Sequence, residues 1–171
     1  MTRVMKIALS LIIFLGIGSA IFLYFFPFAK EIDVDRPAVF FYEQKPSSLE
    51  HISIHISGTL YRPFLRQHKF VGSIRIDGFD VTKEYDPFDT YVLERKKGIN
   101  SGNLVYLKSK KHRDILMAGM IWFDDDFKEI SIWWNNKNLH QFIVTADSYK
   151  EALIVQQKMR EVFGSSFVPK I

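Results

Sequence analysis

A run of 20 consecutive residues near the N-terminus carries no charge and is almost entirely apolar. The run, IALSLIIFLGIGSAIFLYFF, extends from Ile7 to Phe26. A helix rises about 1.5 Å per residue, so a helix of this length covers the ~30 Å hydrocarbon core of a bilayer. Pro27 is expected to end it. The pattern predicts a transmembrane helix over residues 7–28.

The charges that flank this run predict its orientation. Arg3 and Lys6 precede it, whereas the chain becomes acidic directly after Lys30. Because positive charge stays on the cytoplasmic side, we expect residues 1–6 in the cytoplasm and the remainder outside, as a single-pass signal-anchor in the cell membrane. A cleaved signal peptide is the alternative, but its apolar region spans only about 7 to 15 residues. Here the segment 21–26 continues the apolar run beyond the small residues that a cleavage site would need.

The segment 29–48 reads as a tether. It contains Pro37, Pro46 and the pair Ser47 and Ser48, which favour turns and extended chain over a helix. Its AVFFY stretch is compatible with a short edge strand. We expect a folded extracytoplasmic domain to occupy residues 49–171.

Alternating apolar and polar positions predict the first strands of this domain. Ile52, Ile54 and Ile56 point one way within the segment 49–61, and the same pattern recurs over 70–76. Glycines at 58, 72 and 78 suggest bulges or sharp curvature. Further strands are expected at 91–94, 104–108, 115–123, 129–134 and 141–145. The run 115–123 is apolar on both faces, which favours the centre of the sheet.

A helix is predicted at about 149–163. Ser148 and Glu151 have the spacing of a capping box, and Gly164 is suited to a left-handed C-terminal cap. An apolar stripe should pack this helix on the sheet. The predicted fold class is therefore α+β: one transmembrane helix, then a mainly antiparallel curled β-sheet of six or seven strands, or a small barrel, closed by a C-terminal α-helix.

Composition limits the chemistry available to this domain. The chain has no cysteine, so disulfides, thiolate metal sites and a cysteine nucleophile are excluded. The net charge is +4 for the whole chain, but residues 31–171 hold 20 basic and 19 acidic residues, a net charge of +1. The basic character thus belongs to the flanks of the anchor and gives no reason to expect nucleic acid as a partner.

The sequence contains no motif for catalysis, nucleotide binding or a cofactor, and we expect no cofactor to be bound. His51 and His55 have a spacing used by zinc sites on helices, but on a strand their Cα atoms lie roughly 13 Å apart, too far to share one ion. Asp124, Asp125 and Asp126 lack the alternate spacing and the glycine of calcium loops, so a solvated hairpin turn is favoured.

Two groups of residues are candidates for a binding surface. Trp133 and Trp134 are adjacent on a strand and therefore face opposite sides, so one of them is expected in the core and the other is a candidate for exposure. Packing of both against the helix or a strand is the alternative. Lys110, Lys111 and Arg113 form a basic run that could contact anionic lipid or an anionic polymer, although solvated loop lysines are the favoured explanation.

One pattern combines three features: an I-x-I-x-G strand at 54–58 followed by KFVGSIRID, the DDDFKEISIWW hairpin, and the FIVTADSYKEAL entry into the helix. In this pattern the chain resembles small uncharacterised single-pass membrane-anchored proteins of Gram-positive bacilli. The resemblance covers most of residues 49–155. It implies the topology described above and assigns no catalytic residue.

The sequence thus favours a non-enzymatic, membrane-tethered domain that binds or scaffolds an envelope protein or anionic polymer. One alternative is an extracytoplasmic hydrolase of envelope polymers that uses acidic residues between positions 77 and 89. A second is an accessory subunit that contacts a membrane complex through its helix.

Overall fold

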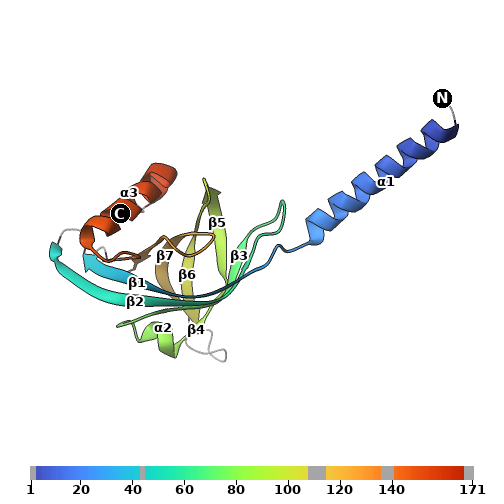
Figure 1. Cartoon of the computed structure of the whole chain (residues 1–171). Helices are drawn as coiled ribbons and strands as arrows, with labels where there is room; N and C mark the ends of the chain where they lie inside the picture. Colours follow the sequence, from blue (N-terminus) through green and yellow to red (C-terminus); the bar gives the residue numbers. More distant parts are fainter. Residues whose placement is uncertain (1–2, 43–44, 108–114, 136–140, 168–171) are drawn as a thin grey trace.

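The computed structural model describes residues 3–42, 45–107, 115–135 and 141–167. Figure 1 shows a long N-terminal helix that stands away from a β-rich body. This helix, α1 (Arg3–Phe25), buries none of its residues and is long and apolar enough to cross a membrane. It ends before the predicted boundary at 28, because a residue that precedes a proline, here Phe26, avoids the helical conformation.

The β-rich body is a closed barrel. Each of eight strands in the described part of the chain pairs antiparallel with the next one, and the last pairs with the first. The strands are β1 (Lys30–Tyr42), β2 (Lys45–Tyr61), β3 (Lys69–Ile76), β5 (Thr90–Lys96), β6 (Ile99–Leu107), β7 (Ile115–Asp124), β8 (Ile130–Trp134) and β9 (Gln141–Val144). The prediction of six or seven strands was wrong, because β1 adds an eighth strand. Its pairing with β9 removes the free edges, so the sheet is a closed barrel and not an open curled sheet.

Strand β1 lies where the sequence predicted a tether. It pairs with β2 from Lys30↔Leu60 onward and with β9 only over Val39–Tyr42. Pro37, which favoured a tether, falls in the part of β1 that has a strand partner on one side only. A missing backbone donor is tolerated at such edge-like positions, so the proline is compatible with the strand.

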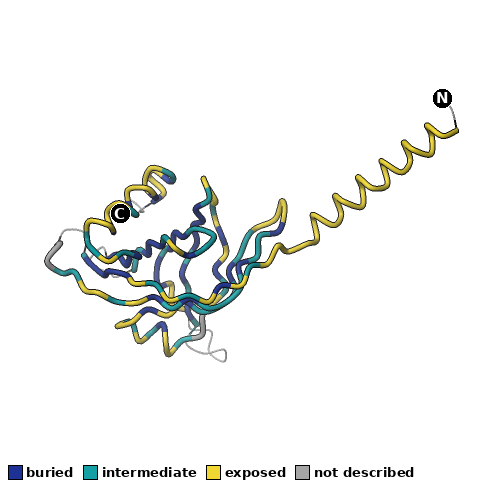
Figure 2. Tube along the Cα trace, viewed as in Figure 1, coloured by how far each residue is buried: buried dark blue, intermediate teal, exposed yellow. Residues whose placement is uncertain are grey.

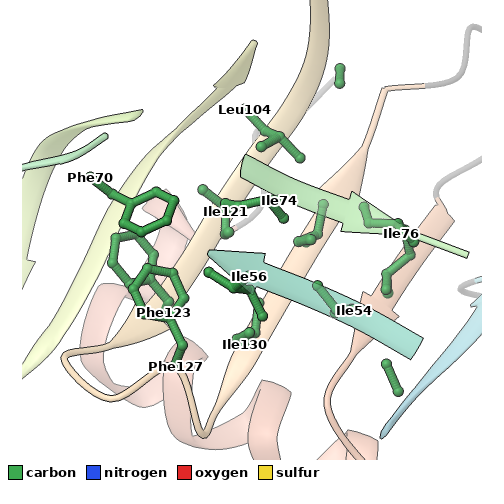
Figure 3. Packing of buried hydrophobic residues seen from close by; sticks show 14 of the residues in the cluster. Ile54, Ile56, Phe70, Ile74, Ile76, Leu104, Ile121, Phe123, Phe127 and Ile130 are labelled. Carbon is green, nitrogen blue, oxygen red and sulfur yellow. The ribbon is translucent and has the colours of Figure 1, made fainter. Parts of the chain in front are cut away.

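Alternating residues of the strands fill the barrel interior with apolar side chains. Ile54 and Ile56 of β2 and Ile74 and Ile76 of β3 point inward as the alternation predicted, and the labelled side chains in Figure 3 meet one another across the interior. In β7 the alternation of inward and outward side chains is interrupted by a bulge, because Leu104↔Gly119 is followed by Val105↔Met117. The interior is a packed core.

The seam between β3 and β5 is short. Only Lys69↔Tyr91 and Phe70↔Thr90 pair there, and beyond them a small helix α2 (Val81–Glu84) and a two-residue strand β4 (Asp86–Pro87) occupy the space before β5. The hydroxyl of Tyr106, buried in β6, donates to the carbonyl oxygen of Ile74 at 2.6 Å. This side chain therefore supplies a donor to β3 beyond the short β3–β5 pairing.

One aromatic residue closes the barrel end that faces α1. Phe127, in the β7–β8 hairpin, is fully buried and stacks on Phe123 with 4.4 Å between ring centroids. Its ring also lies 5.0 Å from that of Phe70, and its carbonyl oxygen accepts from Nε of Arg36 at 2.8 Å. The hairpin thus folds back over the end of the core.

The C-terminal helix α3 (Tyr149–Phe163) packs on the outside of the barrel. Ser148 caps it by accepting from the backbone N–H of Glu151, and Gly164 ends it with φ 58°, as predicted. Its buried residues contact outward-facing side chains of β1, β6, β7 and β9, and a 3-10 turn, η1 (Gly164–Ser166), follows it. Figure 2 shows the opposite face of α3 exposed. The closure of the barrel therefore comes from the strands, while α3 covers one side.

Candidate functional site

A polar cluster surrounds Asp125 at the barrel end that faces α1. Its carboxylate accepts hydrogen bonds from Arg95 at 2.8 Å, from Asn100 at 2.9 Å and from Arg62 at 3.3 Å. These partners come from β5, from β6 and from the β2–β3 loop, and the side chain of Asp125 is only 22% exposed. Asp125 therefore makes an ionic contact between four parts of the barrel. The expected hairpin turn is present, but the expected solvation was wrong at Asp125.

Electrostatics hold two carboxylates of this hairpin, those of Asp125 and Asp126, in their charged form. Burial alone would raise the pKa of Asp125, but the hydrogen bonds from Asn100 and Arg95 and the charges of Arg95 and Arg62 together lower it. The neighbouring Asp126 pairs with Lys30, and this hydrogen bond lowers the pKa of Asp126. The start of β1 is thereby fixed to the hairpin.

Beside this cluster lies a surface groove of about 330 Å³ between the β2–β3 loop and β5. We call it the basic groove, and its lining residues are Arg66, Gln67, His68, Val92, Leu93, Glu94 and Arg95. The loop is held to the strand because Val92 donates to the carbonyl oxygen of His68 at 3.0 Å and Gln67 donates to that of Val92 at 3.2 Å. The groove exists because the loop extends the short β3–β5 seam.

The pKa of His68 is affected by the charges around the basic groove. Burial, together with the positive charges of Arg95 and Arg62, lowers the pKa of His68 below its ordinary 6.5, although Asp125 opposes this shift. Its Nδ1 atom and Nε of Arg62 are buried without a hydrogen-bond partner in the described part of the chain. Burial and the two guanidinium groups therefore disfavour the charged form of the His68 imidazole.

The basic groove lies next to the end of α1. The backbone N–H of Arg62 donates to the carbonyl oxygen of Pro27 at 2.9 Å, directly after the helix. The guanidinium of Arg66 is 5.3 Å from the ring centroid of Tyr24, and its Nη2 lies 3.5 Å from the carbonyl oxygen of Phe25. The residues that line the groove are thus placed where the chain leaves the apolar helix.

A larger concavity of about 540 Å³ has a different character. Its five described lining residues all belong to α3: Leu153, Gln156, Gln157, Arg160 and Glu161. It is therefore a depression along one helix. The basic groove, by contrast, is built by residues from two elements that are distant in the sequence.

The two tryptophans of the predicted binding surface lie on opposite sides of β8, and both are half-buried. Trp133 packs on the outer side, against the same buried clusters as Val155 of α3. Trp134 packs against the barrel core, with its ring 4.7 Å from that of Phe79. Neither tryptophan is exposed, so the alternative in which both pack against neighbouring elements describes them.

The remaining sequence candidates are a basic run and two histidines. Lys110, Lys111 and Arg113 lie outside the described residues. On β2, His51 is exposed, whereas Nδ1 of His55 lies 2.6 Å from a carboxylate oxygen of Asp35.

The acidic stretch 77–89 shows no paired carboxylates across a cleft among its described side chains. Asp77 pairs with Lys83 of α2 at 3.5 Å, while Asp89 pairs with Lys69 of β3 at 2.9 Å. These carboxylates therefore have separate lysine partners. Neither of them lines the basic groove or the depression on α3.

Comparison of the chain with protein-family models, with curated proteins and with solved structures gives no match.

Sequence reasoning missed most of the residues of this site. Arg62, His68, Arg95 and Asp125 are spread over more than 60 positions, and no local spacing connects them. The closed barrel brings these residues together, because the β2–β3 loop, the β5–β6 hairpin and the β7–β8 hairpin meet at the same end.

Proposed function

We propose that this chain is a non-enzymatic, membrane-anchored binding domain that holds an anionic, phosphate-bearing ligand in the basic groove. In this proposal α1 crosses the cell membrane with the N-terminus in the cytoplasm, and the barrel lies outside. The observation that carries the proposal is the position of the groove: Arg66 lines it and also contacts Tyr24 and Phe25 at the end of α1. The groove would therefore be at the level of the membrane surface, where phosphate groups of lipids and envelope polymers are abundant.

The chemistry of the lining supports an anion as the ligand. Arg66 and Arg95 contribute guanidinium groups, which match phosphate oxygens in a bidentate arrangement. Arg66 is exposed and has only weak contacts within the chain, so it is available to a ligand. The barrel interior is filled by apolar side chains, so we place the binding site on the surface.

The ligand is tested with the full chain in zwitterionic detergent micelles. The probes are inorganic pyrophosphate and dihexanoyl phosphatidylglycerol, which present phosphate without and with a lipid. Binding is followed by the NMR signals of the His68 imidazole. An anion in the groove offsets the charges of Arg95 and Arg62, so we expect the pKa of His68 to rise when either probe binds.

A matched pair of variants locates the binding. Arg66→Gln should weaken it severalfold, whereas Arg160→Gln, which removes the same charge from α3, should leave it unchanged. Equal binding by both variants, or an unaltered His68 titration, would contradict the proposal. Topology is tested separately by C-terminal reporter fusions: a reporter that is active in the cytoplasm would reverse the proposed orientation.

A further inference from the structure

The β2–β3 loop exposes two consecutive large apolar side chains. Phe64 is 52% exposed and Leu65 is 82% exposed, at a tip that Figure 2 shows as solvent-exposed. Leu65 also has φ 58°, a left-handed conformation that costs free energy for a residue with a Cβ atom. Phe127 has a similar φ of 51°, but its side chain is fully buried in the core. Leu65 has no such burial within the chain to offset its conformation.

This loop lies against the end of the helix that could cross the membrane. The hydrogen bond from Arg62 to Pro27 and the contact of Arg66 with Tyr24 hold it there. In Figure 1 the β2–β3 hairpin extends beside the segment that joins α1 to β1. A tyrosine at the end of a membrane helix typically lies at the level of the lipid headgroups. The tip of the loop is therefore close to that level.

Cations and aromatic rings surround the exposed tip. Nζ of Lys69 lies 5.8 Å from the ring centroids of both Tyr61 and Tyr91, which form one row across β2, β3 and β5. Lys69 is paired with Asp89 and Arg62 with Asp125, so the positive charge next to the tyrosines and the apolar tip is mainly that of Arg66. Segments of that composition bind at the interface of bilayers that contain anionic lipids.

We propose that the β2–β3 loop is a second membrane attachment: Phe64 and Leu65 enter the boundary between headgroups and acyl chains beside α1. Arg66 and Lys69 then lie among anionic headgroups. The loop fixes the tilt of the barrel and keeps the basic groove facing the membrane surface. This inference rests on the proposed membrane span of α1, but it does not depend on which ligand the groove binds.

Because the chain has no native cysteine, a single introduced cysteine can be labelled specifically. Leu65→Cys, Ile154→Cys on the exposed face of α3 and Ile13→Cys in the middle of α1 are each labelled with a polarity-sensitive NBD fluorophore. The full chain is reconstituted into vesicles of phosphatidylcholine with phosphatidylglycerol. We expect residue 13 to report hydrocarbon. The label at residue 65 should be blue-shifted and quenched by lipids with a nitroxide near the headgroup, and the label at residue 154 should report water.

The three positions separate the two proposals. If residue 13 reports hydrocarbon but residue 65 is quenched by aqueous iodide as strongly as residue 154, the loop proposal is overturned and the anchor stands. If residue 13 reports water, the proposed anchor fails and the loop proposal fails with it. Quenching of residue 65 by iodide that is severalfold weaker than that of residue 154 supports the loop attachment.

A second variant tests the role of the neighbouring phenylalanine. Phe64→Asp, introduced beside the label at residue 65, removes an apolar group that the fold does not bury. We expect the protein to stay folded and the emission of the label to shift toward that of residue 154. Unchanged emission in this variant would overturn insertion of the tip.

Discussion

Replacing Phe127 with alanine should open the barrel end that faces α1. The side chain is fully buried, its ring stacks on Phe123 at 4.4 Å between centroids, and it contacts Phe70 at 5.0 Å. Loss of a buried phenylalanine costs about 3 to 5 kcal/mol, because transfer free energy is lost and a cavity remains. The two aromatic contacts place this site toward the upper end, at about 4 to 5 kcal/mol. Alanine has the same difficulty with φ 51°, so no strain is relieved.

The assay is urea unfolding of the full chain in detergent micelles, followed by the fluorescence of its three tryptophans. Phe64→Ala is the matched control, because it makes the same chemical change at a side chain that is 52% exposed. We expect Phe64→Ala to change the free energy of unfolding by less than about 1 kcal/mol. If Phe127→Ala costs less than about 1.5 kcal/mol, or no more than Phe64→Ala, then Phe127 does not close the core and this reasoning is refuted.

Three further predictions concern the seam, the polar cluster and pH. Tyr106→Phe leaves the carbonyl oxygen of Ile74 without its donor and should lower the free energy of unfolding by about 1 to 3 kcal/mol in urea titrations, whereas Tyr91→Phe, at an exposed position, should have little effect. Asp125→Asn leaves the guanidinium groups of Arg62 and Arg95 without their counter-charge. We expect the free energy of unfolding to fall by about 1 to 2 kcal/mol, and by less in high salt. A loss of stability that does not respond to salt would argue against an ionic contact. The pKa of His68 is lower in the folded chain than its ordinary 6.5, so the unfolded chain binds the proton more readily. The stability contributed by neutral His68 is therefore complete above about pH 6.5 and is lost as the pH falls. In thermal melts, the melting temperature should decrease less from about pH 7 to 5 in His68→Gln than in the unmodified chain.

The local patterns predicted the elements that depend on local chemistry. The alternation of Ile52, Ile54 and Ile56 identified β2 and its inward face, and Ser148, Glu151 and Gly164 predicted the limits of α3. Only the AVFFY end of strand β1 was considered as a strand, because Pro37 and the charged residues before it are typical of a tether. That segment becomes a strand only because β2 and β9 provide partners for it.

The sequence by itself determined that the chain has an apolar segment of membrane-spanning length, a β-rich body with a terminal helix, and a fold that cannot rely on disulfides. These properties follow from run length, from periodicity and from the absence of cysteine, all of which are local or compositional. Only the tertiary structure decided that the sheet closes and that Arg62, His68, Arg95 and Asp125 meet at the end facing α1. Closure depends on pairing between the first and last strands, and contacts between residues so distant in the chain leave no periodic signal in the sequence.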